Sequence, residues 1–337
     1  MKRRIRLLTL LLGLSILAAC TRTSPDPTQS PTPSAGVEAQ SVRVAMLKGP
    51  TGLGAAYLMD RDLAEDPAME YTFTLMAEPT EAVAALTKGE VDIAALPTNL
   101  AAVLYHKNED VQLLCLNTYG VLYILENGFD VNSLADLAGK TLYATGQGAN
   151  PEYVLNYLLD KNGLKAGEDV DIQWMAADAL TAAVTDGEVT LALLPVPAAT
   201  GVMLKNENVR PAVDLNDAWS EAGARGTLTM GCVVARKEFI TANPGAVKAF
   251  MEDYGESIRY MSDPDNLEAA AALAEKHGIV PSAAVAREAL PDANLCFVTG
   301  NDMISGIQGY YEVLYAADPS SIGGSIPDGE FYYDYKR

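Results

Sequence analysis

An eleven-residue phrase occurs twice in this chain, and its repetition restricts the fold more than any other feature. Residues 87–97 align without gaps with residues 185–195, and seven of the eleven positions are identical. Each copy has the pattern of a helix that ends at glycine, then a buried strand that a proline stops. The alternative is a chance match in a common pattern. If the copies are equivalent, each half of the chain brings a strand's carboxyl end and a helix's amino end to one sheet edge, where open α/β sheets bind ligands.

Short apolar runs alternate with longer amphipathic stretches along most of the chain. An apolar stripe at helical spacing runs from Val247 to Met261, which predicts a long packed helix. Strands that alternate with helices indicate an α/β fold whose sheets are mostly parallel and flanked by helices. The predicted strands cover residues 42–46, 71–75, 91–96, 111–116, 140–144, 170–174, 190–194 and 227–235.

The first 19 residues have the pattern of a signal peptide. Four basic residues precede an uncharged run of 13 residues from Leu7 to Ala19. As a helix this run would span about 20 Å, which is shorter than the roughly 30 Å hydrocarbon core of a membrane. The run ends in Leu-Ala-Ala-Cys20, which resembles the lipobox of bacterial lipoproteins, whose cysteine is diacylated. An ordinary leader with an incidental cysteine is the alternative. Residues 20–40 contain four prolines and predict a disordered tether.

Charge and composition exclude several functions. Without the leader's four basic residues the chain keeps 24 − 4 = 20 basic and 44 acidic residues, a net charge of −24. Nucleic-acid binding requires a basic face, so it is excluded. Two histidines cannot build a His-based metal cage, and no cofactor motif is present. The three cysteines after Cys20 lie in apolar runs, which predicts buried free thiols, with one disulfide as the alternative.

Three phrases in a fixed order carry a resemblance to a known family: Gly-Glu-Val-Asp-Ile-Ala at 89–94, Leu-Ala-Asp-Leu-Ala-Gly-Lys at 134–140, and the helix start Asn243-Pro244. The chain resembles the extracytoplasmic solute-binding proteins of ABC importers, in their nitrate/sulfonate/taurine and thiamine-precursor branch. The resemblance implies a periplasmic-binding-protein type II fold, with two lobes and a ligand cleft between them. We expect lobe one at 41–120 plus 226–337, lobe two at 121–225, and chain crossings near 119–127 and 216–227.

Four loops that follow predicted strands are expected to line this cleft. Glycines and helix amino ends expose N–H groups to a ligand, although a glycine can instead serve a tight turn. Thr98 and Asn99 have helix capping as an alternative role, and Asn150 precedes a proline as an N-cap would. The first loops offer one lysine and no arginine, which favours recognition by backbone amides and neutral groups. The candidate ligand contacts are Lys48, Thr51, Gly52, Thr98, Asn99, Thr145, Gly146, Gln147, Asn150 and Pro195.

The resemblance implies a monomeric binding protein that is anchored outside the cytoplasmic membrane by lipidated Cys20. It would capture a small polar or anionic solute, of sulfonate, nitrate-like or pyrimidine type, and deliver it to an ABC permease. The alternative is an enzyme on the same fold, similar to the thiamine-pyrimidine synthase or to menaquinone-pathway lyases. The leader and the missing cysteine-rich motif of the synthase favour a protein without enzymatic activity.

Overall fold

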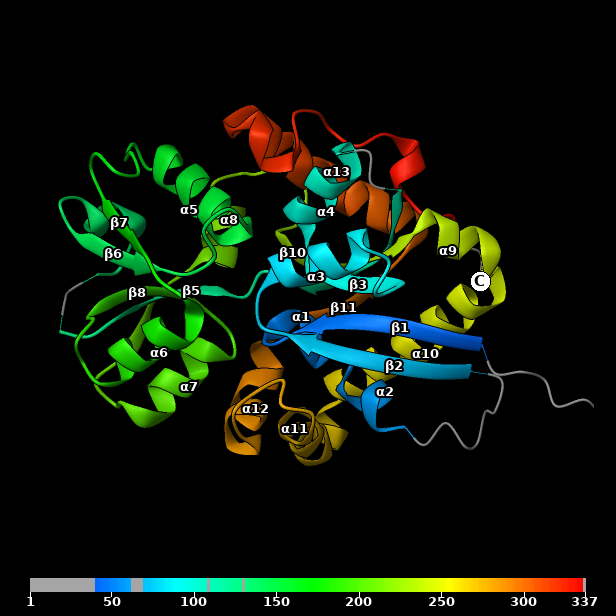
Figure 1. Ribbon diagram of the computed structural model, residues 1–337. Coiled ribbons are helices and arrows are strands. Elements are labelled where there is room, and N and C mark those ends of the chain that lie inside the picture. The colour runs from blue at the N-terminus through cyan, green and yellow to red at the C-terminus, as the bar shows by residue number, and fades with distance from the viewer. Residues whose placement is uncertain (1–39, 62–68, 108–109, 129–130, 336–337) are drawn as a thin grey trace, which may run out of the picture. The chain divides into compact units, whose positions relative to one another are not determined.

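The computed structural model describes residues 40–61, 69–107, 110–128 and 131–335 (Figure 1). The predicted leader, the lipobox Cys20 and the tether before Gln40 lie outside the described residues. Among the helices of these ranges, none is both long and apolar enough to cross a membrane.

The strands form two separate sheets. The first has six strands in the order β11-β4-β10-β3-β1-β2, and the second has five in the order β7-β6-β8-β5-β9. The first sheet comprises β1 (Gln40–Leu47), β2 (Met69–Met76), β3 (Ile93–Pro97), β4 (Val111–Tyr119), β10 (Thr229–Arg236) and β11 (Leu295–Val298). The second comprises β5 (Leu122–Glu126), β6 (Thr141–Ala144), β7 (Asp171–Trp174), β8 (Leu191–Pro195) and β9 (Arg210–Asp214).

Helices flank both sheets (Figure 1). Around the first sheet lie α1 (Pro50–Leu53), α2 (Ala56–Asp60), α3 (Pro79–Thr87), α4 (Thr98–His106), α9 (Lys237–Ala242), α10 (Pro244–Ser262), α11 (Leu267–Lys276), α12 (Ala283–Ala289) and α13 (Gly300–Ala317). Around the second lie α5 (Asn150–Lys161), α6 (Ala177–Thr185), α7 (Ala198–Lys205) and α8 (Leu215–Glu221). We refer to the first sheet and its helices as lobe one, and to the second sheet and its helices as lobe two.

The predicted α/β class is confirmed, but both sheets are mixed rather than mostly parallel. In the first sheet β1 is parallel to β2 and β3, whereas β10 is antiparallel to β3 and β4. In the second, β6 is parallel to β7 and β8, whereas β5 is antiparallel to β8 and β9. Only two residues lie between the end of β4 and the start of β5, but β5 belongs to the second sheet, so the chain passes from one sheet to the other here. The predicted crossing at 119–127 therefore contains a strand.

The two copies of the repeated phrase have the same local structure. Gly89 and Gly187, with φ of 70° and 77°, follow the last turns of α3 and α6, in the left-handed region that favours glycine. The next residue bonds back to its helix in the same way, from Glu90 N to Ala85 O and from Glu188 N to Ala183 O, both at 2.9 Å. Each strand then ends at its proline, so the sequence repeat is a structural repeat.

The central strand β3 of lobe one is covered on both faces. In β3, Ile93 and Ala95 belong to a core with α10, while Ala94 and Leu96 belong to a second core with α3 and α4. This alternation follows from the two-residue period of a strand. The second core continues without interruption into buried residues of α5 and α8 in lobe two. Apolar packing therefore joins the two lobes on the sheet face that α3 and α4 cover.

The chain segment that returns from lobe two to lobe one, between β9 and β10, packs tightly on α13. Thr227 N donates to Gly306 O at 3.4 Å, and the indole of Trp219 donates to Gly226 O at 3.3 Å. A Cβ at Gly226 would lie 2.6 Å from the backbone nitrogen of Tyr310. Glycine is therefore required where this passage crosses α13.

The cysteines have the predicted state. All three in the described residues are free thiols; Cys115 and Cys232 are buried, and Cys296 is partly buried. Burial is the largest cause that raises the pKa of the Cys115 and Cys232 thiols, so neither is a thiolate at neutral pH.

Candidate functional site

A buried polar cluster lies where α4 of lobe one and α5 of lobe two begin. Thr98 and Asn99 open α4, Asn150 opens α5, and all three side chains are fully buried. Buried polar groups need hydrogen-bond partners, so the contacts of this cluster define what the site can still bind.

Asn150 reaches from lobe two into lobe one. Its Nδ2 donates to Thr98 Oγ1 at 2.9 Å and to Met230 O at 2.7 Å. Its Oδ1 accepts the backbone N–H of Asn99 at 3.2 Å and the hydroxyl of Tyr310 at 2.8 Å. The carboxamide is thus fully paired within the protein.

The predicted N-cap role of Asn150 is corrected by this geometry. The N-cap of α5 is Ala149, and Asn150 with Pro151 forms the first helical turn. The Asn150 side chain instead accepts an N–H from the first turn of α4, whose own N-cap is Pro97. A proline side chain has no hydrogen-bonding group, so α4 takes its cap from the other lobe.

Asn99 has one buried oxygen that remains available. Its Nδ2 donates to Gly148 O at 3.4 Å and to Ser321 O at 3.3 Å, the latter in the 3-10 helix η5 (Pro319–Ile322). Within the described residues its Oδ1 has no partner, and the same holds for Oγ1 of Thr229 at the start of β10. Thr229 O accepts from Thr98 Oγ1 at 2.6 Å, so both open atoms belong to one cluster.

The first predicted loop is packed rather than open. Lys48 is exposed, whereas Thr51 is buried and its carbonyl accepts from Asn117 Nδ2 at 3.0 Å. A Cβ at Gly52 would lie 2.0 Å from Leu47 O, so glycine is needed there for the turn between β1 and α1. A Cβ at Gly231 would lie 2.4 Å from Thr51 Cγ2, which places Thr51 against the strand that also carries Thr229.

The lobe-two loops contribute fewer buried groups. Thr145 is buried, Gly146 has φ of 89° and Gln147 is exposed. A Cβ at Gly146 would lie 2.6 Å from Pro151 Cγ, so this glycine also serves the turn. Pro195 is half-buried at the end of β8, where the next residue donates from Val196 N to Val121 O at 2.9 Å.

The structure therefore joins Thr98, Asn99 and Asn150 by direct hydrogen bonds, with Gly148 beside them. It does not bring Lys48, Gln147 or Pro195 into this set of bonds. Sequence reasoning missed two members of the cluster, Thr229 and Tyr310. Thr229 lies inside a correctly predicted strand and Tyr310 on a long helix, so no local motif marked either residue.

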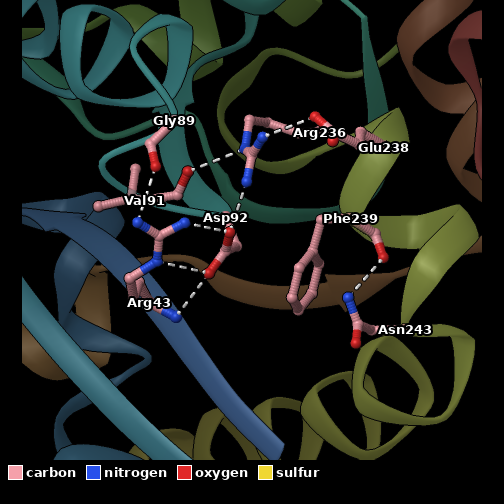
Figure 2. A network of polar contacts seen from close by, with 8 residues as sticks. All are labelled: Arg43, Gly89, Val91, Asp92, Arg236, Glu238, Phe239 and Asn243. Atoms are coloured by element: carbon pink, nitrogen blue, oxygen red, sulfur yellow. Dashed lines mark hydrogen bonds and ion pairs between the residues drawn. The ribbon is translucent and has the colours of Figure 1, made fainter.

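The side chains of this cluster are all neutral. A charge network lies at the other end of β3, around Asp92 (Figure 2). Asp92 precedes β3 there and accepts from Arg43 Nη2 at 2.6 Å and from Arg236 Nη2 at 2.7 Å. Burial alone would raise the pKa of Asp92, but these hydrogen bonds outweigh it and lower the pKa. The Asp92 carboxylate of the Gly-Glu-Val-Asp phrase thus has a structural role within lobe one. We call its ion pairs with Arg43 and Arg236 the lock.

Comparisons with known proteins place the chain in a family. The model of the family described as "NMT1/THI5 like" matches residues 69–267, which is more than half of the chain. Comparison with curated protein sequences finds no match.

Solved structures share the fold over most of the chain. The periplasmic aliphatic sulphonate binding protein SsuA of Escherichia coli aligns with a TM-score of 0.72 at 16% identity, covering 88% of this chain and 93% of that one. An ABC transporter structure from Parabacteroides distasonis aligns with a TM-score of 0.68 at 22% identity, covering 88% and 99%. The periplasmic nitrate-binding protein NrtA of Synechocystis aligns with a TM-score of 0.56 at 14% identity, covering 79% and 75%.

The solved structures confirm the predicted periplasmic-binding-protein type II fold, and the family model agrees with the resemblance that the sequence phrases indicated. Because the family model matches more than half of the chain, the chain belongs to the NMT1/THI5-like family.

Proposed function

We propose that this protein is the solute-binding component of an ABC import system. One observation carries the proposal: polar residues from the beginnings of α4 and α5 meet between two lobes whose fold is that of periplasmic binding proteins. Ligands of open α/β sheets bind where strand carboxyl ends and helix amino ends converge. The beginnings of α4 and α5 are such ends.

The ligand is proposed to be a small polar or anionic molecule, held by neutral groups and backbone amides. Within the described residues Asn99 Oδ1 is an acceptor without a protein partner, so it supports a polar solute with an N–H or O–H group. The Thr229 hydroxyl also has no protein partner there and can donate to a polar or anionic oxygen of the solute. Lys48, Thr51, Thr145 and Gln147 complete the proposed contacts, and Pro195 supplies a wall. Thr98, Gly52, Gly146 and Asn150 support these contacts through the bonds and turns described above.

We also propose that the protein binds its solute without chemical change. The thiols of Cys115 and Cys232 are buried and protonated, so they are poor nucleophiles. His106 ends α4 and His277 caps α11, where His277 Nε2 lies 3.1 Å from Asp60 Oδ1. Both histidines lie at helix ends, which supports structural rather than catalytic roles.

The proposed location is outside the cytoplasmic membrane, with lipidated Cys20 as anchor and an ABC permease as partner of the monomer. The leader and the lipobox-like Leu-Ala-Ala-Cys support the anchor. Cell fractionation of the Cys20→Ala protein tests it. We expect loss of the membrane-bound mature form, and normal processing with full membrane retention would refute the anchor.

Native mass spectrometry of the purified protein tests the proposed function. We expect one small-molecule adduct per chain, released on unfolding, and the released mass identifies the solute. Incubation with that solute should return it unchanged, because binding without chemistry is proposed. Release of a chemically altered product would instead support the enzyme alternative.

A further inference from the structure

Two asparagines connect the lobes in a reciprocal way. The Asn150 carboxamide of lobe two accepts the backbone N–H of Asn99, and the Asn99 carboxamide of lobe one donates to Gly148 O, two residues before Asn150. Each side chain therefore contacts the backbone at the beginning of the opposite helix. Both contacts join groups that belong to different lobes.

The bonds of Asn150 are complete without any solute. Two donors and one acceptor of its carboxamide are used by Thr98, Met230, Asn99 and Tyr310, all of which lie in lobe one. A side chain with no remaining hydrogen-bonding capacity gains nothing from a ligand group. The contribution of Asn150 is therefore to the contact between the lobes.

Packing beside Asn150 makes the same connection. Tyr310 of α13 donates to Asn150 Oδ1, and its ring lies 5.5 Å from the ring of Trp219 in α8. Arg225 and Glu312 form an ion pair at 3.2 Å next to this contact, although Arg225 is largely exposed and contributes little. The middle of α13 thus contacts lobe two through Tyr310.

We propose that Asn150 is an interlobe latch, a positioning residue that holds the lobes together before solute binds and so raises solute affinity without contacting the solute. If the lobes separate, water can reach Asn99 N, Thr98 Oγ1 and Met230 O and replace the lost bonds. The latch therefore sets the fraction of protein in the binding-competent arrangement, and apparent affinity scales with that fraction. The affinity effect rests on the proposed function, whereas the interlobe contact does not.

Small-angle scattering of the solute-free protein tests the latch directly. Asn150→Ala should increase the radius of gyration, because the lobes lose their shared polar contact and move apart as units. The matched control is Asn117→Ala. Asn117 is also a buried asparagine, but its Nδ2 bonds to Thr51 O and to the Tyr254 hydroxyl at 2.9 Å, both within lobe one. The control should leave the radius of gyration unchanged.

Trp219 supplies a second readout in the same samples. In a Trp174→Phe background Trp219 is the sole tryptophan, and its emission should shift to longer wavelength in Asn150→Ala and in the milder Tyr310→Phe variant. Each variant is first shown to unfold cooperatively. An unchanged radius of gyration and unchanged emission in folded Asn150→Ala would overturn the latch.

Calorimetric titration separates the latch from the proposed function. With the solute identified by native mass spectrometry, Asn150→Ala should weaken binding by roughly 5- to 150-fold, and Asn117→Ala should weaken it less. Wild-type affinity in folded Asn150→Ala would refute the affinity effect. If no solute binds even the wild-type protein, the proposed function fails, while the solute-free scattering still decides whether the latch exists.

Discussion

The guanidinium of Arg43 binds the carboxylate of Asp92 through two hydrogen bonds, from Nε to Oδ2 at 2.9 Å and from Nη2 to Oδ1 at 2.6 Å (Figure 2). Arg236 approaches the same carboxylate from β10, so one buried acid joins β1, β3 and β10. The equivalent position in the second copy of the repeat is Thr190. The lock therefore belongs to lobe one alone, although the surrounding phrase occurs in both lobes.

Replacing Asp92 with asparagine should lower the free energy of unfolding by about 1.5–3 kcal/mol, the usual range for hydrogen bonds to charged groups. The figure is below that of a fully buried pair, because the Arg43 side chain is 42% exposed. The control is Glu238→Gln, which removes an exposed partner of Arg236 and should change stability by less than about 1 kcal/mol. Chemical denaturation measures both, and equal effects of the two substitutions would contradict the lock.

The lowered pKa of Asp92 also predicts a pH dependence. An acid whose folded-state pKa is depressed adds stability above its unfolded value of about 3.9, and this stability is lost as pH falls through the folded-state pKa. Below about pH 4 the free energy of unfolding should therefore fall more steeply in the wild type than in Asp92→Asn. Denaturation curves collected across this range test the difference, and parallel pH profiles would argue against it.

Gly52→Ala should destabilise the fold by about 1–3 kcal/mol or more, because the new methyl group would collide with the carbonyl of Leu47. Gly245→Ala is the matched control. It lies in α10, where the nearest atom to an added Cβ is 3.9 Å away, and alanine there should be neutral or slightly stabilising. Thermal melts compare the two, and a neutral Gly52→Ala would show that this turn is more open than described.

Asn99→Ala should weaken solute binding, since it removes a buried oxygen proposed to accept from the solute. Loss of such a partner costs about 1–3 kcal/mol, or roughly 5- to 150-fold in affinity. Gln147→Ala should have a smaller effect, because Gln147 is exposed. His106→Ala and His277→Ala should leave affinity nearly unchanged. Normal affinity in Asn99→Ala would show that the solute does not contact Asn99 at the beginning of α4.

Much of the fold could be predicted because its signals are local. The repeated phrase ends two helices at glycine and two strands at proline, and both copies were located from sequence. The strands β5, β9 and β11 were missed. β11 is an edge strand of only four residues between helices. β5 follows β4 without a helix between them, so the alternating pattern gave no boundary. β9 is an edge strand that contains Pro211, which is unusual inside strands but tolerated at sheet edges.

The site was predicted less well, because its partners are distant in the chain. The positions of Thr98, Asn99 and Asn150 after predicted strands predict that they lie together, and they do. A local capping rule assigned Asn150 to its own helix, whereas its oxygen caps a helix that begins 52 residues earlier. Thr229 and Tyr310 became part of the site only through packing against α4 and α5, and single-sequence patterns do not encode such contacts.

The central claim, that this protein binds a small solute between its lobes, is tested most directly by calorimetric titration. The wild-type protein is titrated with aliphatic sulfonates, nitrate and aminopyrimidines, alongside any solute released from the purified protein, with Asn99→Ala and His277→Ala in parallel. The account predicts one-to-one binding of one solute class, weakened in Asn99→Ala and unchanged in His277→Ala. Binding that is equally strong in all three proteins, or conversion of the titrant to product, would contradict it.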